Sequence, residues 1–401
     1  MKVLYVCNLP SFIKQHLQTH IRYLEKQGLT VECVCPEDKE TAELQAAGII
    51  IHSLPIDRKI DPMSNYQCVM RLAKLMRKGG YDVVHVHNPV ASILGRVAAR
   101  LAGIKKVIYT SHGLFIHDLT PPLPYTFFWS AEVFASQLTN LIFSVNREDI
   151  QRLSIPILCP ENRFAYLGSV GVDIKDFDPR RITLGLQNNL RQEFKIPEDA
   201  FPIVGTIGRI NEKKGSLFFI EAIHQLQAKY PNIHTLIIGE EVSSDPDGCQ
   251  NKAQQQIYDL NLENNITLTG YRDDIPELLS LMDAFCLPTF AHEGLPSAVI
   301  EAMAMEKPVV ASNIRGCREA IINQETGFII PPRNTDALAN ALDFLLANPE
   351  QAKQMGVRGR QRVLENYSMD LVLQRLHQGY QALGILSEQH YPAEKVINVV
   401  S

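Results

Sequence analysis

Short apolar runs alternate with helical patterns along the first part of the chain. The runs that predict buried strands are Val3–Cys7, Thr30–Cys35, Ile49–Leu54, Asp82–Val86, Lys106–Tyr109 and Leu141–Val145. After the first run, apolar residues recur at helical spacing from Ile13 to Leu24 until Gly28 ends the helix. Further helices are expected near Tyr66–Lys78 and Leu94–Ala102. Strands separated by helices are typical of parallel βαβ units in a doubly wound sheet.

A second alternation follows a polar stretch at 172–189, where we expect a domain boundary. Its predicted strands and helices are Ile203–Ile207, Leu217–Lys229, His234–Ile238, Lys252–Leu260, Ile266–Leu268, Ile275–Met282, Ala284–Leu287, Pro296–Met305, Val309–Ala311, Arg318–Ile322, Gly327–Ile330, Thr335–Leu346 and Gln351–Tyr367. We therefore predict two Rossmann-like α/β domains, residues 1–178 and 190–366, facing each other across a cleft. A C-terminal helix at about 368–386 is expected to pack back on the first.

Composition and length agree with this organisation. A chain of 401 residues is too long for one ordinary hydrophobic core, and 45% hydrophobic with 21% charged residues is typical of a soluble globular protein. No run of about 18 apolar residues is present that would span a bilayer. The apolar start stops at Asn8 without a cleavage site, so we expect a first strand rather than a signal peptide. Eight cysteines without a Cys-x-x-Cys pair predict reduced thiols and a cytoplasmic location.

Two carboxylates eight positions apart form the first candidate site. Glu293 lies in a turn with Gly294, before a helix that Pro296 can start, and Glu301 lies in the first turns of that helix. A glycine-containing loop that runs into a helix suits a phosphate group, and the carboxylates can accept hydrogen bonds from sugar hydroxyls. A solvated acidic helix turn would explain Glu293 equally well. It explains Glu301 less well, because that residue lies between apolar neighbours on an apolar helix.

Two cations five positions apart form the second candidate site. Arg209 and Lys214 follow the predicted strand Ile203–Ile207 and are flanked by Gly208 and Gly215. Arginine can bind a diphosphate through two parallel hydrogen bonds and lysine as a point charge. The glycine spacing is neither that of a Walker A loop nor that of a dinucleotide fingerprint. Taken alone, a basic loop between a strand and a helix is more often simply solvated.

These two elements, in this order, resemble those of the family-4 retaining glycosyltransferases of the GT-B fold. The resemblance covers nearly the whole chain and is most specific between Val204 and Ile330, where Thr269-Gly270-Tyr271 and Gly316-Cys317-Arg318-Glu319 also match. It implies that Glu293 contacts the transferred sugar, that Glu301 binds the ribose and that Arg209 and Lys214 hold the diphosphate. The implied donor-binding set is Arg209, Lys214, Gly239, Tyr271, Arg272, Gly294, Leu295, Pro296 and Glu301.

The same resemblance gives a role to three residues of the first domain. His112 and Gly113 follow the predicted strand Lys106–Tyr109, and family members use such a histidine at the reaction centre. We therefore expect His112, with Glu293, to be catalytic and Gly113 to lie on the acceptor side. His16 on the first helix is a weaker acceptor-side candidate. Without the resemblance, His112 would more often be an ordinary loop histidine.

The chain departs from many family members in the loop after its first strand, where Asn8-Leu9-Pro10-Ser11-Phe12 replaces a Gly-Gly pair. That loop resembles the subgroup that assembles capsules, exopolysaccharides and lipid-linked oligosaccharides. Segments 144–149 and 168–173 resemble it too. The resemblance implies a donor nucleotide sugar, UDP-linked and carrying a hexose or N-acetylhexosamine. It implies a glycan or lipid-diphosphate-linked acceptor and no nucleic acid.

Two segments bear on contact with a membrane. The predicted helix Tyr66–Lys78 carries four cations among apolar residues, so it can lie on anionic lipid, although such helices are more often merely solvated. Segment Leu123–Phe134 holds five aromatic residues that can enter the membrane interface or belong to the core. The first 180 residues hold 20 Lys and Arg against 17 Asp and Glu, an excess that can also be chance. Peripheral contact with the cytoplasmic face is the resulting expectation.

No metal or other cofactor is expected. Asp176-Phe177-Asp178 and Asp245-Pro246-Asp247 match the Asp-x-Asp spacing of metal-dependent transferases, but both lie in polar loops where chance matches are frequent. Arg209 and Lys214 can neutralise the leaving diphosphate instead, and no covalent nucleophile stands out. The alternatives are a sugar-nucleotide epimerase or phosphorylase of the same fold, and a catalytically silent sugar-binding protein. Retention of both glutamates with both cations is the feature that disfavours a silent protein.

Overall fold

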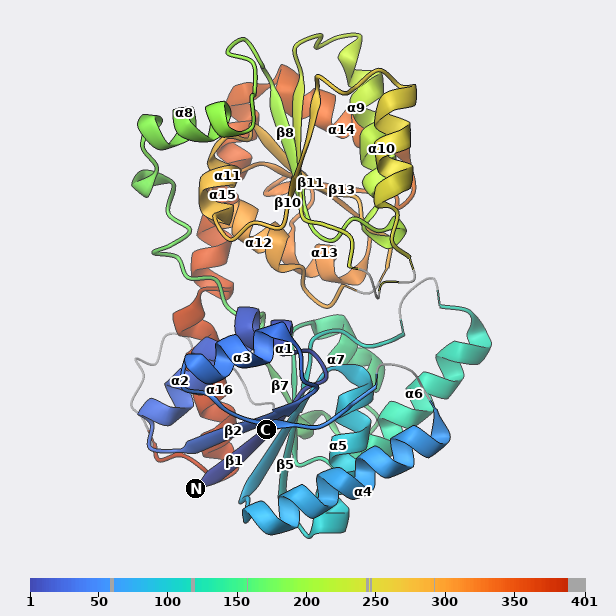
Figure 1. The fold of residues 1–401 in the computed structure, drawn as a ribbon, viewed down its shortest axis with the longest axis vertical. Helices are drawn as coiled ribbons and strands as arrows, with labels where there is room; N and C mark the ends of the chain where they lie inside the picture. The colour runs from blue at the N-terminus through green and yellow to red at the C-terminus, as the bar shows by residue number, and fades with distance from the viewer. Residues whose placement is uncertain are drawn as a thin grey trace. The chain divides into compact units, whose positions relative to one another are not determined.

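The computed structural model describes residues 1–57, 61–116, 120–156, 158–242, 245, 247–291 and 293–388. The chain folds as two compact units, Met1–Gly171 with Asp370–Ser401, and Val172–Met369 (Figure 1). Residues 172–178, which the sequence prediction assigned to the first domain, belong to the second unit. The Val172 amide donates to the Tyr367 carbonyl (3.0 Å), and the Met369 amide donates to the Val172 carbonyl (2.8 Å).

The first unit is built on a seven-stranded parallel sheet. Its strands, in spatial order, are β3 (Ile50–Ser53), β2 (Thr30–Cys35), β1 (Lys2–Val6), β4 (Val83–His87), β5 (Lys106–Ser111), β6 (Leu141–Ser144) and β7 (Phe164–Tyr166). The six predicted strands are confirmed. The short strand β7, with only three residues, is too brief to produce a detectable pattern. The order reverses between β1 and β4, and such a switch point is where open α/β sheets bind ligands.

Helices cover both faces of this sheet. They are α1 (Pro10–Phe12), α2 (Gln18–Lys26), α3 (Lys39–Ala46), α4 (Pro62–Gly79), α5 (Pro89–Ala102), α6 (Pro122–Ser136), α7 (Arg147–Leu153) and α16 (Met369–Ala382), with one π-helical turn, η1 (Ile13–Leu17), and a short 3₁₀ turn, η2 (Glu161–Arg163). The first predicted helix therefore contains a π turn, a feature often found at functional sites. Proline starts α4 and α5, and left-handed Gly80 and Gly103 end them.

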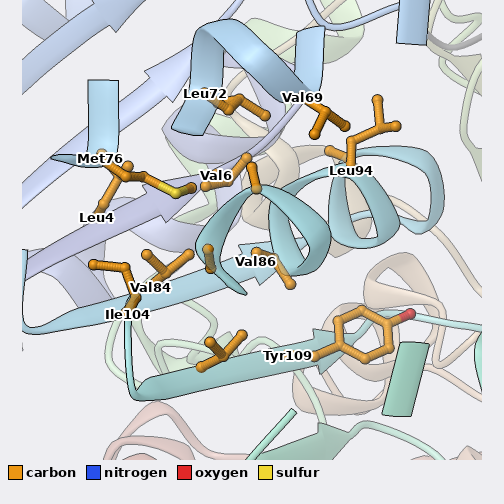
Figure 2. Packing of buried hydrophobic residues seen from close by; sticks show 14 of the residues in the cluster. Leu4, Val6, Val69, Leu72, Met76, Val84, Val86, Leu94, Ile104 and Tyr109 are labelled. Atoms are coloured by element: carbon orange, nitrogen blue, oxygen red, sulfur yellow. The ribbon is translucent and has the colours of Figure 1, made fainter. Parts of the chain in front are cut away.

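Apolar side chains from α4, α5 and the central strands form the core of this unit (Figure 2). Leu72 and Met76 of α4 are fully buried with Val6 of β1 and Val86 of β4. Each such side chain contributes about 1.5–3 kcal/mol of transfer free energy. Gly95 allows α5 to lie close to the sheet, because a Cβ there would come within 2.7 Å of the Val86 side chain. The strand ends that carry candidate site residues are thus fixed by a rigid core.

The second unit contains a six-stranded parallel sheet. Its order is β10 (Ile266–Gly270), β9 (His234–Ile238), β8 (Ile203–Ile207), β11 (Ala284–Leu287), β12 (Val309–Ser312) and β13 (Gly327–Ile330). All six predicted strands are confirmed. Its helices are α8 (Leu184–Glu193), α9 (Ser216–Gln227), α10 (Gln250–Asp259), α11 (Ile275–Ser280), α12 (Ser297–Ala304), α13 (Arg315–Ala320), α14 (Thr335–Ala347) and α15 (Pro349–Asn366), with 3₁₀ turns η3 (Pro179–Arg181) and η4 (Glu212–Lys214). Two parallel-sheet α/β domains confirm the predicted fold class.

All eight cysteines are free and buried. Among the helices in the described ranges, none has both the length and the apolar content that crossing a bilayer would require.

Candidate active site

The loop that leaves β8 is held in one shape by its own side chains. Asn211 accepts a hydrogen bond from the Lys214 amide (2.8 Å) through its side-chain oxygen, and its amide group donates to Asp245 (2.8 Å). Gly215 ends the η4 turn in the left-handed region, at φ 81°. A Cβ on Gly215 would come within 2.3 Å of the Pro288 carbonyl oxygen. Glycine is therefore required there for two reasons, and it brings Lys214 against the end of β11.

Lys214 and Glu293, which lie 79 positions apart in the sequence, form a direct ion pair. The Lys214 Nζ lies 2.5 Å from the Glu293 Oε1, and both side chains are largely buried. The two segments are also tied through Lys213, whose carbonyl accepts from the Phe290 amide and the Thr289 hydroxyl, both at 3.0 Å. The pair joins the two predicted sites, cationic and acidic, into one.

The main chain at Glu293 is fixed from the other side by α13. A Cβ on Gly316 would come within 2.8 Å of the Glu293 carbonyl oxygen, so that helix lies directly against the loop. The Arg315 Nε donates to the same carbonyl at 3.3 Å. Sequence analysis noted the matching segment at Gly316 but not this reason for it, because a close approach of two backbones leaves no periodic pattern.

Glu301 differs from Glu293 in having no hydrogen-bond or ion-pair partner for its carboxylate in the ranges that the structure describes. It lies on α12, which follows the predicted Gly294-Leu295-Pro296 segment and starts one residue later than expected, with Pro296 as the residue preceding the helix. No side chain caps its first amides. Burial raises the pKa of the Glu301 carboxyl to about 7. An unpaired carboxylate of this kind gains most from a ligand that donates hydrogen bonds to it.

The remaining predicted donor-binding residues lie at the ends of β8, β9 and β10. Arg209 pairs with Asp245 at 2.6 Å and is half-exposed. Gly239 adopts φ 126°, and a Cβ there would come within 2.1 Å of the Gly208 carbonyl oxygen, so the ends of β8 and β9 touch. Tyr271 is half-exposed, and its hydroxyl donates to Asp273 (2.8 Å).

The Arg272 side chain already has partners within the second unit. Its guanidinium pairs with Asp274 and Glu193, both at 2.6 Å, and lies over the Phe194 ring. These two carboxylates raise the pKa of the Arg272 guanidinium. The sequence places Arg272 among the donor-binding residues but does not reveal its partner Glu193, which lies at the end of α8, just after the polar stretch 172–189.

In the first unit, His112 and Gly113 follow β5 at the carboxyl edge of the sheet. The His112 Nε2 lies 3.1 Å from the Nδ1 of His87, and the centroids of the Phe12 and His112 rings lie 4.6 Å apart in an edge-to-face arrangement. Burial lowers the pKa of His112 and of His87 well below the usual range, so both rings are neutral. Sequence analysis missed His87. The available signal was two histidines, His85 and His87, inside an otherwise apolar strand.

His16 lies on the π turn η1, close to Phe12 (ring centroids 4.8 Å apart). Burial lowers the pKa of its imidazole to about 4. The Phe12 ring therefore contacts both His16 and His112. In the described part of the chain, no hydrogen bond joins the two histidines directly.

The Asp-x-Asp stretches have partners of their own. Asp176 and Asp178 pair with Arg181 and Arg180, while Asp247 pairs with Lys213 at 2.5 Å. Pro246 lies outside the described residues, as does His292 beside Glu293. Within the described ranges, no group of histidine, cysteine, aspartate and glutamate side chains is arranged to hold a metal ion.

Comparisons with known proteins identify the family. Residues 187–362 match the family model described as glycosyl transferases group 1, and residues 2–146 match glycosyl transferase 4-like. The chain is 30% identical to the Bacillus subtilis protein EpsD, named as a glycosyltransferase, over 78% of this chain and 80% of that one. It is 29% identical to an Escherichia coli UDP-Gal:alpha-D-GlcNAc-diphosphoundecaprenol alpha-1,3-galactosyltransferase over 80% of each.

Solved structures show the same fold. The structure of Anabaena HepE in complex with UDP and glucose has a TM-score of 0.80 and 18% identity, and it covers 95% of this chain and 100% of that one. A glycosyltransferase from Rickettsia africae has a TM-score of 0.79 and 24% identity, with 95% and 98% covered. The chain therefore belongs to the family-4-like, group 1 glycosyltransferases, and it is a glycosyltransferase of the GT-B fold.

Proposed function

We propose that this enzyme transfers a hexose or N-acetylhexosamine from a UDP-linked donor to a lipid-diphosphate-linked acceptor, with retention at the anomeric carbon. The observation that carries the proposal is the Lys214–Glu293 pair, 2.5 Å long, on the same unit as the unpartnered Glu301. Relatives named for transfer to diphosphoundecaprenol-linked sugars, from Escherichia coli and Campylobacter jejuni, support the acceptor class. The HepE complex with UDP supports the donor class.

The second unit is proposed to hold the donor. Its two candidate phosphate ligands, Arg209 and Lys214, are each neutralised by a carboxylate in the free protein, at 2.6 and 2.5 Å. A diphosphate can replace those carboxylates as the partner of the cations, which releases Glu293 to accept hydrogen bonds from the sugar. The same cations then stabilise charge that develops on the departing nucleoside diphosphate. Glu301 accepts hydrogen bonds from the ribose hydroxyls.

The first unit is proposed to hold the acceptor, with His112 contacting the reacting sugar. Its imidazole is neutral, so it serves through hydrogen bonding rather than charge. Gly113 follows β5 with His112 at the carboxyl edge of the sheet, and His16 lies on the η1 turn. We assign both residues to the acceptor side. We assign no covalent nucleophile and no metal.

The direct test is a transfer assay with a panel of UDP-sugars and diphospho-lipid acceptors, with products analysed both with and without acceptor. Acceptor-dependent release of UDP with a new glycosidic bond supports the proposal. Donor isomerisation without acceptor would indicate an epimerase. Sugar 1-phosphate formed when inorganic phosphate is the acceptor would indicate a phosphorylase. Failure to bind any sugar nucleotide in calorimetry would favour a catalytically silent sugar-binding protein.

We further propose that the first unit docks on an anionic membrane surface through α6 and α4. Three large apolar side chains on one face of α6 are exposed: Leu123 (84%), Phe127 (59%) and Phe134 (64%). They lie four and seven positions apart, which is the spacing of one helical face. The single charged residue of α6, Glu132, is instead buried against Arg96 at 2.8 Å. An uncharged apolar stripe of this kind suits the lipid interface.

Helix α4 supplies charge complementary to anionic lipid. Its first half exposes Met63, Tyr66 and Met70, and its second half exposes Arg71, Lys74, Arg77 and Lys78. Both α4 and α6 contact α5 within the same unit (Figure 1). Each basic residue near an anionic surface contributes about 1 kcal/mol.

Vesicle co-sedimentation tests this docking. We expect Phe127→Ser/Phe134→Ser to weaken binding to vesicles that contain phosphatidylglycerol by about tenfold or more. Leu184→Ser is the control, since Leu184 is even more exposed (79%) but lies on the second unit. Equal binding of all three proteins, or equal binding to uncharged vesicles, would contradict the docking surface and leave the enzymatic proposal intact.

A further inference from the structure

His87 and His112 form a buried pair of imidazoles at the carboxyl edge of the first sheet. His87 is the last residue of β4, and His112 follows β5, the neighbouring strand. The His87 Nδ1 and His112 Nε2 are 3.1 Å apart, and the planes of the two rings differ by only 22°. Nearly parallel rings at that distance are suited to an N–H···N hydrogen bond, for which one nitrogen must carry the proton and the other must not.

The outer nitrogen of each ring has no partner in the described part of the chain. These are the Nε2 of His87 and the Nδ1 of His112, and both atoms are buried. Since both imidazoles are neutral, the pair holds two ring protons, and one lies in the bond between the rings. The other proton is therefore on one of the two outer nitrogens.

The surroundings decide which nitrogen carries it. An N–H group buried without an acceptor is rarer in proteins than a buried acceptor without a donor. His87 is 1% exposed and packed against the rings of Tyr5 (4.8 Å) and His85 (4.4 Å). The His112 side chain as a whole is partly exposed and lies where the strand ends, although its Nδ1 is buried in the free protein. The arrangement with the lower cost leaves the His87 Nε2 bare, has the His87 Nδ1 donate to the His112 Nε2, and keeps the second proton on the His112 Nδ1.

From this geometry we infer that His87 is a positioning residue that fixes His112 as a hydrogen-bond donor through its Nδ1. The inference rests on the proposed function, because it makes His112 a neutral donor to an oxygen of the bound substrate. A sugar hydroxyl or an oxygen of the leaving diphosphate is the chemistry that such a group recognises. His87 itself touches no substrate and acts through His112.

The two amide substitutions at His87 separate positioning from simple packing. In His87→Asn, the amide takes the place of Nδ1 and can still donate to the His112 Nε2. In His87→Gln, the amide lies nearer the position of Nε2 and cannot. We expect nitrogen-15 spectra of the imidazoles to show a proton on the His112 Nδ1 in the wild type and in His87→Asn. In His87→Gln that proton should be shared between the two nitrogens. A His112 that carries its proton on Nε2 in the wild type would overturn the inference.

Turnover gives the second readout. His87→Gln is expected to lower kcat by about ten- to hundredfold with little change in the donor KM, while His87→Asn recovers most of the activity. The control is His234→Asn, a change at a buried strand histidine of the second unit whose ring nitrogen lies 3.0 Å from the Thr267 hydroxyl. It should reduce thermal stability without moving the His112 proton. Equal losses in His87→Gln and His87→Asn would show that the role is structural. A wild type without transferase activity would defeat the proposed function alone, since the spectra still test the tautomer.

Discussion

The two candidate site regions differ in the kind of interaction that each is built to make. The region around Lys214 in the second unit consists of ion pairs on loops held by glycines, and its side chains are partly exposed. The region around His112 in the first unit consists of neutral imidazoles and aromatic rings at rigid strand ends. Charged side chains on loops are suited to binding a charged, flexible diphosphate. Neutral side chains at strand ends are suited to orienting hydroxyl groups through hydrogen bonds.

Removing the ammonium group should have the largest effect. We expect Lys214→Ala to lower kcat by about a hundredfold to a thousandfold, because under the proposed function the charge that forms on the leaving diphosphate loses one of its two cations. A UDP-sugar transfer assay measures this. Lys213→Ala is the matched control from the same loop, as its ammonium pairs with Asp247 instead. Equal activity of the two variants would contradict the proposal that the Lys214 charge stabilises the leaving diphosphate.

Adding one methyl group at Gly215 should disrupt the same region through the backbone. Gly215→Ala combines left-handed strain with a clash against the Pro288 carbonyl. The substitution should therefore lower the free energy of unfolding of the second unit and move Lys214 away from Glu293. Gly28 has a similar left-handed φ of 85°, but a Cβ there would meet no atom within 4 Å, so Gly28→Ala should cost only the strain, about 1–2 kcal/mol. Denaturant titration compares the two. A smaller loss at Gly215 than at Gly28 would contradict the tight contact.

Donor affinity should depend on pH through Glu301. Its carboxyl has a pKa raised to about 7 by burial, so it is mostly protonated below that pH and ionised above it. Ribose hydroxyls donate best to the ionised form, and affinity for an intact UDP-sugar should therefore rise as pH increases through 7. It should be about tenfold weaker one unit below the pKa than at full ionisation. Calorimetry across this range should show a slope in the wild type that is absent in Glu301→Gln. A slope that persists in the variant would assign the titration to another group.

Arg272→Ala should have the smallest effect. Its guanidinium is engaged by Glu193 and Asp274 at the surface, so its loss should cost about 1 kcal/mol of stability. We expect the donor KM to rise less than in Arg209→Ala, because among the described residues Arg209 has one carboxylate partner, Asp245, which leaves more of its guanidinium available. Thermal melting and donor titration of both variants measure this. A larger rise in KM for Arg272→Ala would show that this residue also meets the donor.

Much of the fold follows from the sequence because parallel strands buried on both faces are continuous apolar runs. Strand Ala284–Leu287 and strand Ile203–Ile207 have the predicted bounds for that reason. The elements that were missed are short or polar, such as β7 and helix α8 in the stretch expected to be a linker. For segment Leu123–Phe134 the sequence left two alternatives open, core or membrane interface. In the structure the aromatic residues are split between core and surface, because Phe128 and Trp129 pack on the core while Phe127 is exposed.

The sequence by itself determined the two α/β domains, the family and the glutamates and cations of the second unit, because strand periodicity and motif spacing are local properties. It could not determine that Lys214 pairs with Glu293, that Arg272 is held by Glu193, or that His87 meets His112. Those contacts depend on which strands are neighbours in a sheet and on how closely glycines let two backbones approach. Only the tertiary structure decides both, because sequence-distant side chains meet only where the packed sheets bring them together.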